Sequence, residues 1–141
     1  GRQWYGLFPP AWDSVPSEEH DLQDRLKAIA SEEIPLSKTV LFGFSQGAAM
    51  ALATGCRLPF AGIIACSAYP HPDWKPPMKT PPILLLHGKN DEIVPIMASF
   101  KLKEQFTKNQ SKTELISFDG GHEIPKTLIG KMRLTLQDWL I

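Results

Sequence analysis

The sequence predicts an α/β protein with a mostly parallel β-sheet and helices on both of its faces. Short, mostly apolar runs alternate along the chain with longer segments whose apolar residues recur at helical spacing. A strand that is buried on both faces has a continuous apolar run, and strand–helix–strand alternation is typical of a parallel sheet. The length of 141 residues is close to the commonest size of one domain, so residues 1–141 are expected to form a single domain.

Four helices connect or flank the strands. An irregular segment, residues 1–16, comes first, and Ser17 is suited to cap a helix that Pro35 closes. The strand-like runs cover residues 39–43, 61–66, 83–87 and 113–118. Further helices are predicted at 48–53, with Gly55 terminating the helix, and at 95–108. The last helix carries one apolar stripe, made by Leu128, Ile129, Met132, Leu136, Trp139 and Leu140.

The composition is that of an ordinary soluble domain. Fifteen Lys and Arg residues balance fifteen Asp and Glu residues, and neither sign forms a long run. This balance gives no reason to expect a nucleic-acid or membrane-surface partner. Neither a transmembrane stretch nor a signal peptide is visible, which favours a cytoplasmic location. Cys56 and Cys66 are interpreted as reduced structural thiols rather than a disulfide or a metal pair.

A nucleophile motif follows the first predicted strand. Residues 43–47, Gly-Phe-Ser-Gln-Gly, fit the pattern G-x-S-x-G, in which a serine occupies a sharp turn between a strand and a helix. By chance alone a chain of this length contains the pattern in about one case in twenty. Its place between a buried strand and a helix strengthens the prediction that Ser45 is a nucleophile, although a serine there can also simply cap the helix.

Two further loops supply an acid and a base. Asp91 lies four residues past the third predicted strand, and His122 lies four residues past the fourth. Because the carboxyl ends of parallel strands meet at one sheet edge, we expect Ser45, Asp91 and His122 to converge there. A serine hydroxyl needs a nearby base, which His122 would supply while Asp91 orients it. The order Ser, Asp, His is that of an α/β-hydrolase.

Each of these roles has an alternative. His122 can instead cap or contact the last helix, and Asp91 can be a turn residue. Asp119 is the competing acid, but three residues before His122 a role in the turn is favoured. His87 is expected to hydrogen-bond at a strand end.

The two remaining histidines are expected to matter less for catalysis. His20 is expected to be solvated on its helix. His71, in the proline-rich loop, can line the site, but a place outside the site is favoured. No ligand pattern for a metal, no P-loop and no dinucleotide fingerprint is present, so neither a metal nor a cofactor is expected.

The three motifs together resemble the phospholipase/carboxylesterase family, which includes acyl-protein thioesterases and small bacterial carboxylesterases. They are Gly-Phe-Ser-Gln-Gly at 43–47, His-Gly-x-x-Asp-x-x-Val-Pro at 87–95 and Gly-Gly-His-Glu-Ile-Pro at 120–125. Arg2-x-Trp4-Tyr5 also resembles a family segment, so the resemblance covers essentially the whole chain.

The resemblance implies a serine carboxylesterase that cleaves small-molecule carboxylic esters through an acyl-enzyme on Ser45. Thioesters and lysophospholipids are further candidate substrates, and short acyl esters are favoured. The backbone N–H of Gln46 would hold the oxyanion. Tyr69 and Trp74, with Trp4, are candidates for the substrate pocket, although aromatic residues in proline-rich loops are as often plain core residues.

The chain departs from the family in its first half. The loop that carries the second oxyanion donor in the family has no counterpart here, and only the last four strands of the sheet are recognisable. The strand at 39–43 should be central, yet nothing pairs with its other edge. An unpaired apolar edge favours aggregation. We therefore expect an N-terminally incomplete domain, with the edge covered by a missing N-terminal segment or by a second copy in a homodimer.

Two other functions compete with the esterase. One is a catalytically impaired, hydrolase-like fragment that acts as a binding or assembly module through its open strand edge. The other is a dienelactone-type hydrolase, which ranks low because that chemistry uses a cysteine at the position of Ser45.

Overall fold

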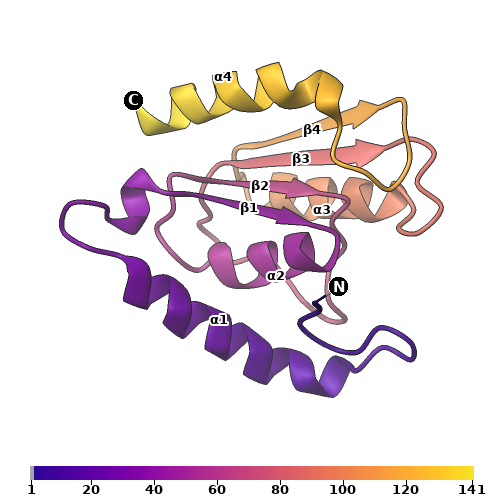
Figure 1. Ribbon diagram of the computed structural model, residues 1–141, viewed down its shortest axis with the longest axis horizontal. Helices are drawn as coiled ribbons and strands as arrows, with labels where there is room; N and C mark the ends of the chain where they lie inside the picture. Colours follow the sequence, from indigo (N-terminus) through magenta and orange to yellow (C-terminus); the bar gives the residue numbers. More distant parts are fainter. Residues whose placement is uncertain (1) are drawn as a thin grey trace.

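The computed structural model describes residues 2–141 and contains one four-stranded sheet. The strands are Val40–Phe44 (β1), Gly62–Cys66 (β2), Ile83–Gly88 (β3) and Thr113–Phe118 (β4). They lie side by side in the order β1-β2-β3-β4, and all three pairings are parallel. Figure 1 shows all four arrowheads at the same edge of the sheet. The predicted parallel α/β class is confirmed.

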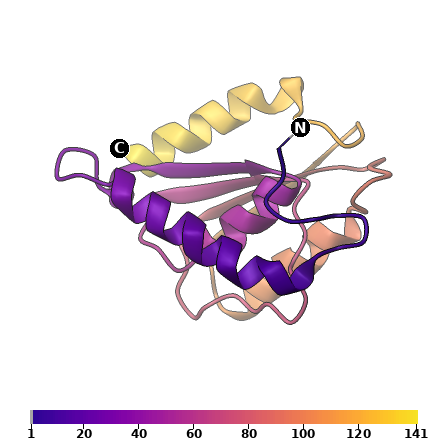
Figure 2. The ribbon, with the colours of Figure 1, turned by 60° about the horizontal axis from the view of Figure 1, so that its bottom comes forward.

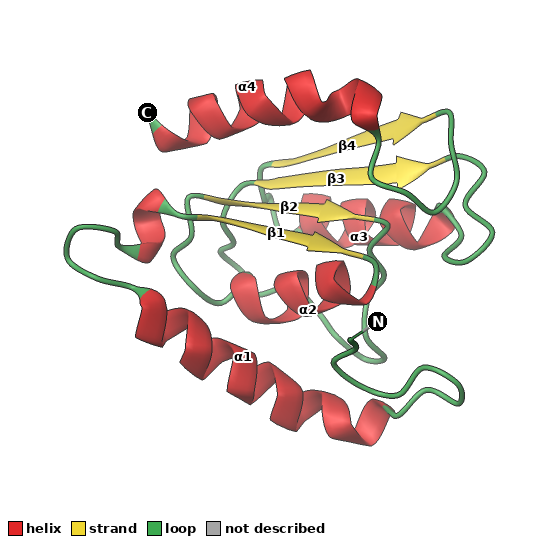
Figure 3. Ribbon diagram, viewed as in Figure 1, coloured by secondary structure: helices red, strands yellow, loops and turns green. Residues whose placement is uncertain are grey.

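Helices cover both faces of the sheet. They are Val15–Ile29 (α1), Gln46–Gly55 (α2), Met97–Lys108 (α3) and Ile129–Leu140 (α4). Helix α4 lies over one face, whereas α2 and α3 lie over the other, with α1 outside α2 (Figures 1 and 3). Three short 3-10 turns complete the secondary structure of the described residues, at Trp12–Ser14, Leu36–Lys38 and Lys126–Leu128.

Strands β2 and β3 form the centre of the core, and every residue in them is buried. Alternate side chains point to opposite faces of a strand. Ile63 and Leu85 accordingly contact the layer of α2 and α3, where Phe106 is fully buried, whereas Leu84 and Leu86 face α4. Each fully buried side chain of this size contributes roughly 1.5–3 kcal/mol, so the continuous apolar runs are what hold the sheet between its helices.

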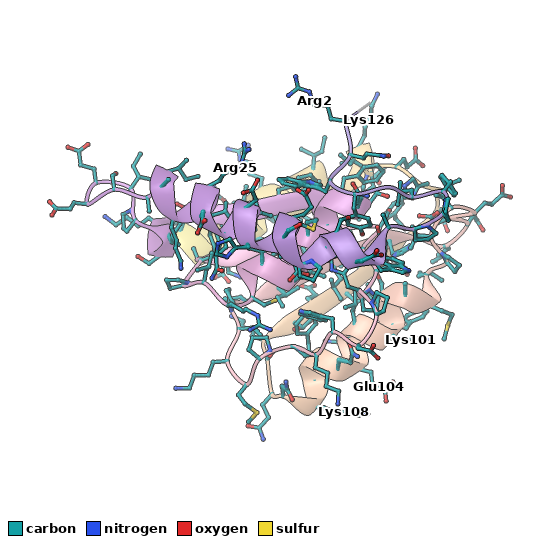
Figure 4. The ribbon with its side chains drawn as sticks, turned by 90° about the horizontal axis from the view of Figure 1, so that it is seen from below. Arg2, Arg25, Lys101, Glu104, Lys108 and Lys126 are labelled. Atoms are coloured by element: carbon teal, nitrogen blue, oxygen red, sulfur yellow. The ribbon has the colours of Figure 1, made fainter. Side chains whose placement is uncertain are left out.

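The outer side of α3 is charged. Lys101, Glu104 and Lys108 project from this helix away from the sheet (Figure 4), and an ion pair of 3.2 Å joins Lys108 to Glu104. Polar residues therefore occupy the face of α3 that is opposite to its buried Leu102 and Phe106. This is the arrangement of an amphipathic helix on the surface of a domain.

Strand β1 is an edge strand. It pairs with β2, and no other described strand lies on its far side. The side chain of Phe42, in the middle of β1, is 45% exposed, and Val40 and Leu41 are half-buried. The expectation of an open apolar edge at this strand therefore agrees with the arrangement of the described residues.

The boundaries of three helices differ from the expected ones, and α3 begins at Met97 rather than at residue 95. Helix α1 begins at Val15, so Ser17 lies within the first turn and is not the N-cap. Its hydroxyl donates to the carbonyl of Ser14 at 2.9 Å. The prediction was wrong because Pro16 fits the first turn of a helix, where its missing N–H has no intrahelical partner anyway. Helix α2 begins directly after Ser45 and ends at Gly55.

Candidate active site

Ser45 occupies a sharp turn between β1 and α2. Its backbone has φ 55° and ψ −119°, a conformation that a residue with a side chain rarely adopts. Such a backbone costs on the order of 1–3 kcal/mol and persists where its surroundings hold it. Here the N–H of Ser45 donates to the carbonyl of Cys66 at 2.8 Å, and its own carbonyl accepts from Ala49 at 3.0 Å. The turn is therefore anchored to β2 on one side and to α2 on the other.

The two glycines of the motif are not equivalent. A Cβ on Gly43 would lie 2.7 Å from both the nitrogen and the Cα of Ala48, and it would also meet the carbonyl oxygen of Gly47. A Cβ on Gly47 would have no heavy atom within 4 Å. Only Gly43 is required for the close approach of strand and helix beneath Ser45.

Asp91 and His122 meet at the carboxyl edge of β3 and β4. Nδ1 of His122 lies 2.8 Å from Oδ2 of Asp91, and the Asp91 side chain is fully buried whereas that of His122 is 19% exposed. Because a carboxylate only accepts hydrogen bonds, Nδ1 carries the proton. Nε2 of the neutral imidazole is then a lone-pair acceptor, which is the form that a general base needs.

Main-chain donors fix the acid. Oδ1 of Asp91 accepts from the N–H groups of Ile93 at 2.9 Å and Val94 at 2.8 Å. Burial by itself raises the pKa of the Asp91 carboxyl, but the hydrogen bonds from His122, Val94 and Ile93 outweigh it and hold this pKa below its ordinary value. Asp91 is therefore an anionic, immobile partner for His122 at neutral pH.

Backbone hydrogen bonds tie the acid loop to the histidine loop. Lys89 donates to the carbonyl of Phe118 at 2.9 Å, and Asn90 donates to that of Gly120 at 3.0 Å. A Cβ on Gly88 would overlap the main chain of Gly120 and Gly121. The absence of a side chain at Gly88 is what lets the loop carrying His122 lie against the end of β3.

His122 lies next to the nucleophile turn. Its ring contacts that of Phe44, the residue before Ser45, with the centroids 4.8 Å apart. Among the described residues, no hydrogen bond joins the Ser45 hydroxyl to Nε2 of His122. Catalytic hydrogen bonds are often long in the absence of substrate and tighten when it binds. The structure thus joins His122 directly to Asp91 and places the His122 imidazole beside the turn that holds Ser45.

A hollow of about 490 Å³ opens beside Ser45. It lies between the N-terminal segment and the nucleophile turn, and Figure 2 shows that segment passing the start of α2. Its lining consists of Arg2, Gln3, Trp4, Leu7, Phe44, Ser45, Gln46 and Gly47. As the first residue of α2, Gln46 has a backbone N–H without an acceptor inside the helix, which leaves it free for an oxyanion.

Two residues expected at the pocket lie elsewhere. Trp74 stacks edge-on against Phe106 at 5.9 Å between centroids, and it belongs to the core layer of α2 and α3. Tyr69 lies 2.6 Å, hydroxyl to hydroxyl, from Tyr5. Neither lines the hollow beside Ser45, whereas Trp4 does. Burial of the apolar Trp74 ring against the core is more favourable than its exposure in an open loop. The proline-rich segment around Trp74 therefore did not indicate a place at the pocket.

The other candidate side chains also lie outside the hollow. Asp119 is 92% exposed and pairs with Lys89 at 3.5 Å. His87 is fully buried, lies 2.6 Å from the Ser99 hydroxyl and contacts the carbonyl of Val94 at 2.7 Å.

The remaining two histidines are both remote from Ser45. His71 is buried against Glu19 and Tyr5. The side chain of His20 is 75% exposed and pairs with Asp24 on α1.

Sequence reasoning missed the role of the Gln46 side chain and the contribution of Leu7 and Phe44 to the hollow. The amide of Gln46 bonds the main chain of residues 4 and 5, which lie 42 and 41 positions away. No local pattern reports such a contact. The only signal in the sequence was the presence of Arg2-x-Trp4-Tyr5 ahead of the first helix.

No cluster of three or more His, Cys, Asp or Glu side chains that could hold a metal ion occurs within residues 2–141. In the same part of the chain, no helix is both long and apolar enough to cross a bilayer.

The parallel sheet and its sharp turn after β1 define an α/β-hydrolase fold. The chain belongs to the phospholipase/carboxylesterase family, which it matches over residues 4–140.

Known relatives support this assignment. Acyl-protein thioesterase 1 from Yarrowia lipolytica is 29% identical over 131 residues, a match that covers 77% of this chain and 57% of the relative. The crystal structure of esterase PE8 superposes with a TM-score of 0.83 at 29% identity, over 92% of this chain and 63% of that protein. SOBER1 of Arabidopsis thaliana, at 20% identity, has a TM-score of 0.80 over 99% of this chain and 71% of its own, which shows the shared fold. The chain thus spans less than two thirds of the length of the first two relatives.

Proposed function

We propose that the protein is a serine hydrolase that cleaves carboxylic esters through an acyl-enzyme, with Ser45 as nucleophile, His122 as general base and Asp91 as its orienting acid. The observation that carries this proposal is the 2.8 Å contact between Nδ1 of His122 and the buried carboxylate of Asp91. It leaves Nε2 as the basic atom beside the strained turn of Ser45. Membership of a family of esterases and thioesterases supports the same reaction.

The reaction proceeds in two halves. The Ser45 hydroxyl oxygen bonds to the carbonyl carbon of the ester while Nε2 of His122 takes its proton, and the backbone N–H of Gln46 donates to the developing oxyanion. The carbon–oxygen bond of the ester then breaks, and His122 gives the proton to the leaving alcohol. In the second half, water loses a proton to His122, attacks the acyl carbon and releases the acid with regeneration of Ser45.

The substrate class proposed first is a short-chain acyl ester. The hollow beside Ser45 is open and of modest size, with Trp4, Leu7 and Phe44 as its apolar walls. Thioesters are the second substrate class, because a relative is an acyl-protein thioesterase. Hydrolysis rates for a series of p-nitrophenyl esters of increasing acyl length test the preference for short acyl chains. The rate should fall once the acyl chain is longer than the hollow.

A fluorophosphonate probe tests the nucleophile. The folded protein should become covalently labelled, and Ser45→Ala should abolish the labelling. Ser67→Ala is a matched control, because Ser67 also follows a strand with φ 55° but is fully buried. The control should retain the label. A folded protein that takes up no label would contradict the proposal and leave the binding-module alternative.

A further inference from the structure

Gln46 anchors the N-terminal segment next to the nucleophile through both ends of its side-chain amide. Nε2 of Gln46 donates to the carbonyl oxygen of Tyr5 at 2.8 Å, and Oε1 accepts from the N–H of Trp4 at 2.5 Å. Gln46 is only 8% exposed, so water cannot readily replace either partner. The residue that follows Ser45 therefore holds the main chain of Trp4, which forms a wall of the hollow.

The phenol of Tyr5 continues this arrangement into a buried chain of hydrogen bonds. The Tyr5 hydroxyl lies 2.6 Å from that of Tyr69 and 3.0 Å from Nε2 of His71. Nδ1 of His71 lies 3.1 Å from a carboxylate oxygen of Glu19, on α1. With a neutral imidazole, all donors run in one direction: Tyr69 donates to Tyr5, Tyr5 to His71, and His71 to Glu19.

The centre of this chain of hydrogen bonds is buried, and none of its four side chains lines the hollow. Tyr5 is 3% exposed and His71 is 6% exposed, and the ring of Trp12 lies against both, at 5.6 Å and 6.0 Å between centroids. Neither His71 nor Glu19 lines the hollow beside Ser45. Any influence that they have on substrate must pass through Tyr5 and the main chain of Trp4.

The catalytic pair is held independently of this chain. Asp91 and His122 are fixed by each other, by the N–H groups of Ile93 and Val94, and by hydrogen bonds between the loops after β3 and β4. No described hydrogen bond links these loops to Tyr5, His71 or Glu19. Different parts of the protein therefore position the two sides of the site. The loops at the sheet edge hold His122 and Asp91, whereas the buried hydrogen bonds of Tyr5 help to hold Trp4 at the hollow.

We propose that His71 and Glu19 are positioning residues for substrate binding, which hold Trp4 in place as the wall of the Ser45 hollow through Tyr5. This inference rests on the proposed hydrolase function for its link to substrate. Loss of His71 removes the acceptor of the buried Tyr5 hydroxyl, and loss of Glu19 removes the acceptor of Nδ1 of His71. Residues 4 and 5 then keep the hydrogen bonds with Gln46 and Tyr69 but are held less firmly. Substrate binding then weakens while the reacting groups stay where they are.

Kinetics of p-nitrophenyl ester hydrolysis test the proposal with two pairs of variants. His71→Phe and Glu19→Ala should each raise KM about tenfold, the size of one lost hydrogen bond, with kcat within about twofold of the wild type. The matched controls are His20→Phe and Glu18→Ala on the same helix as Glu19, and both should leave KM unchanged. A fall in kcat with an unchanged KM would overturn the proposal.

A second measurement does not depend on activity. The indole N–H resonance of Trp4, assigned with Trp4→Phe, should shift in both His71→Phe and Glu19→Ala and stay in place in the two controls. Because Glu19 is partly exposed, Glu19→Ala serves alone if His71→Phe does not fold. An unmoved Trp4 resonance overturns the inference even in an active enzyme. A wild type that takes no fluorophosphonate label contradicts the hydrolase proposal, and the Trp4 resonance still decides whether the chain of hydrogen bonds positions the wall.

Discussion

Asp91 and Asp119 both follow strands close to His122, but they lie in opposite environments. The Asp91 side chain is fully buried and bonded to His122, whereas that of Asp119 is 92% exposed. Asp91→Asn removes the charge that stabilises the imidazolium and allows the wrong tautomer of His122. We expect it to lower kcat on the order of 10⁴-fold, as an amide does at this position of a triad.

Asp119→Asn is the control for this substitution, and it should change kcat by less than about twofold because its ion pair with Lys89 is exposed. Steady-state hydrolysis of one p-nitrophenyl ester by both variants measures the difference. Equal losses in the two variants would show that the orienting acid has been misassigned.

A second prediction at the scale of single residues concerns pH and His71. Burial lowers the pKa of His71 below its ordinary value of 6.5, although the hydrogen bond and the charge of Glu19 oppose this effect. The groups that face its ring are Glu19, Tyr5 and Tyr69. As the pH falls through about 6.5, the unfolded chain binds a proton at this position more readily than the folded one. The contribution of His71 to stability is therefore fully present above that pH and is lost below it.

Urea denaturation at several pH values between about 7 and 5.5 measures this effect. The free energy of unfolding of the wild type should fall with pH more steeply than that of His71→Gln. The same slope in the wild type and in His71→Gln would contradict the sign derived for His71.

At the scale of elements, the turn from β1 to α2 depends on one glycine of its motif. Gly43→Ala would place a Cβ 2.7 Å from the main chain of Ala48. We expect it to destabilise the fold by about 1–3 kcal/mol, as overfilled sites do. Gly47→Ala, in the first turn of α2, meets nothing within 4 Å and should be neutral or stabilising by up to about 1 kcal/mol. Thermal or urea unfolding compares the two, and equal losses would contradict the steric argument.

Most of the helices and strands could be predicted from the periodicity of the apolar residues. The apolar runs that predict β2 and β3 are confirmed, because a strand covered on both faces requires a continuous apolar sequence. The strand predicted at 113–118 is also confirmed, as the half-buried β4. The start of α1 was missed by three residues, because the N-cap is Ser14 and not Ser17. Several residues near position 15 can begin a helix, and the packing of Val15 against Tyr5 and Met50 favours the observed start.

At the scale of the whole molecule, the unpaired edge of β1 is expected to affect self-association. Its Phe42 is 45% exposed on a strand whose outer N–H and C=O groups face no described strand. Unpaired apolar edges associate with other chains. We expect the protein to self-associate with rising concentration and Phe42→Lys to reduce this association.

Phe100→Lys is a matched control, because Phe100 is 46% exposed but lies on α3. It should leave the association unchanged in sedimentation velocity experiments over a range of concentrations. A monomeric wild type, or an equal response to both substitutions, would contradict a role for the β1 edge.

The sequence by itself determined the fold class and the convergence of the loops after β1, β3 and β4, because strand periodicity and parallel order set which loops share an edge. Residue spacing was enough to indicate that Asp91 and His122 would meet. The tertiary structure alone decided which aromatic residues line the hollow, placing Trp4 there and Trp74 in the core. It also decided the partners of Gln46 and His71. Those contacts join segments 41 to 66 residues apart, and their choice depends on the three-dimensional fit of side chains, which no local pattern encodes.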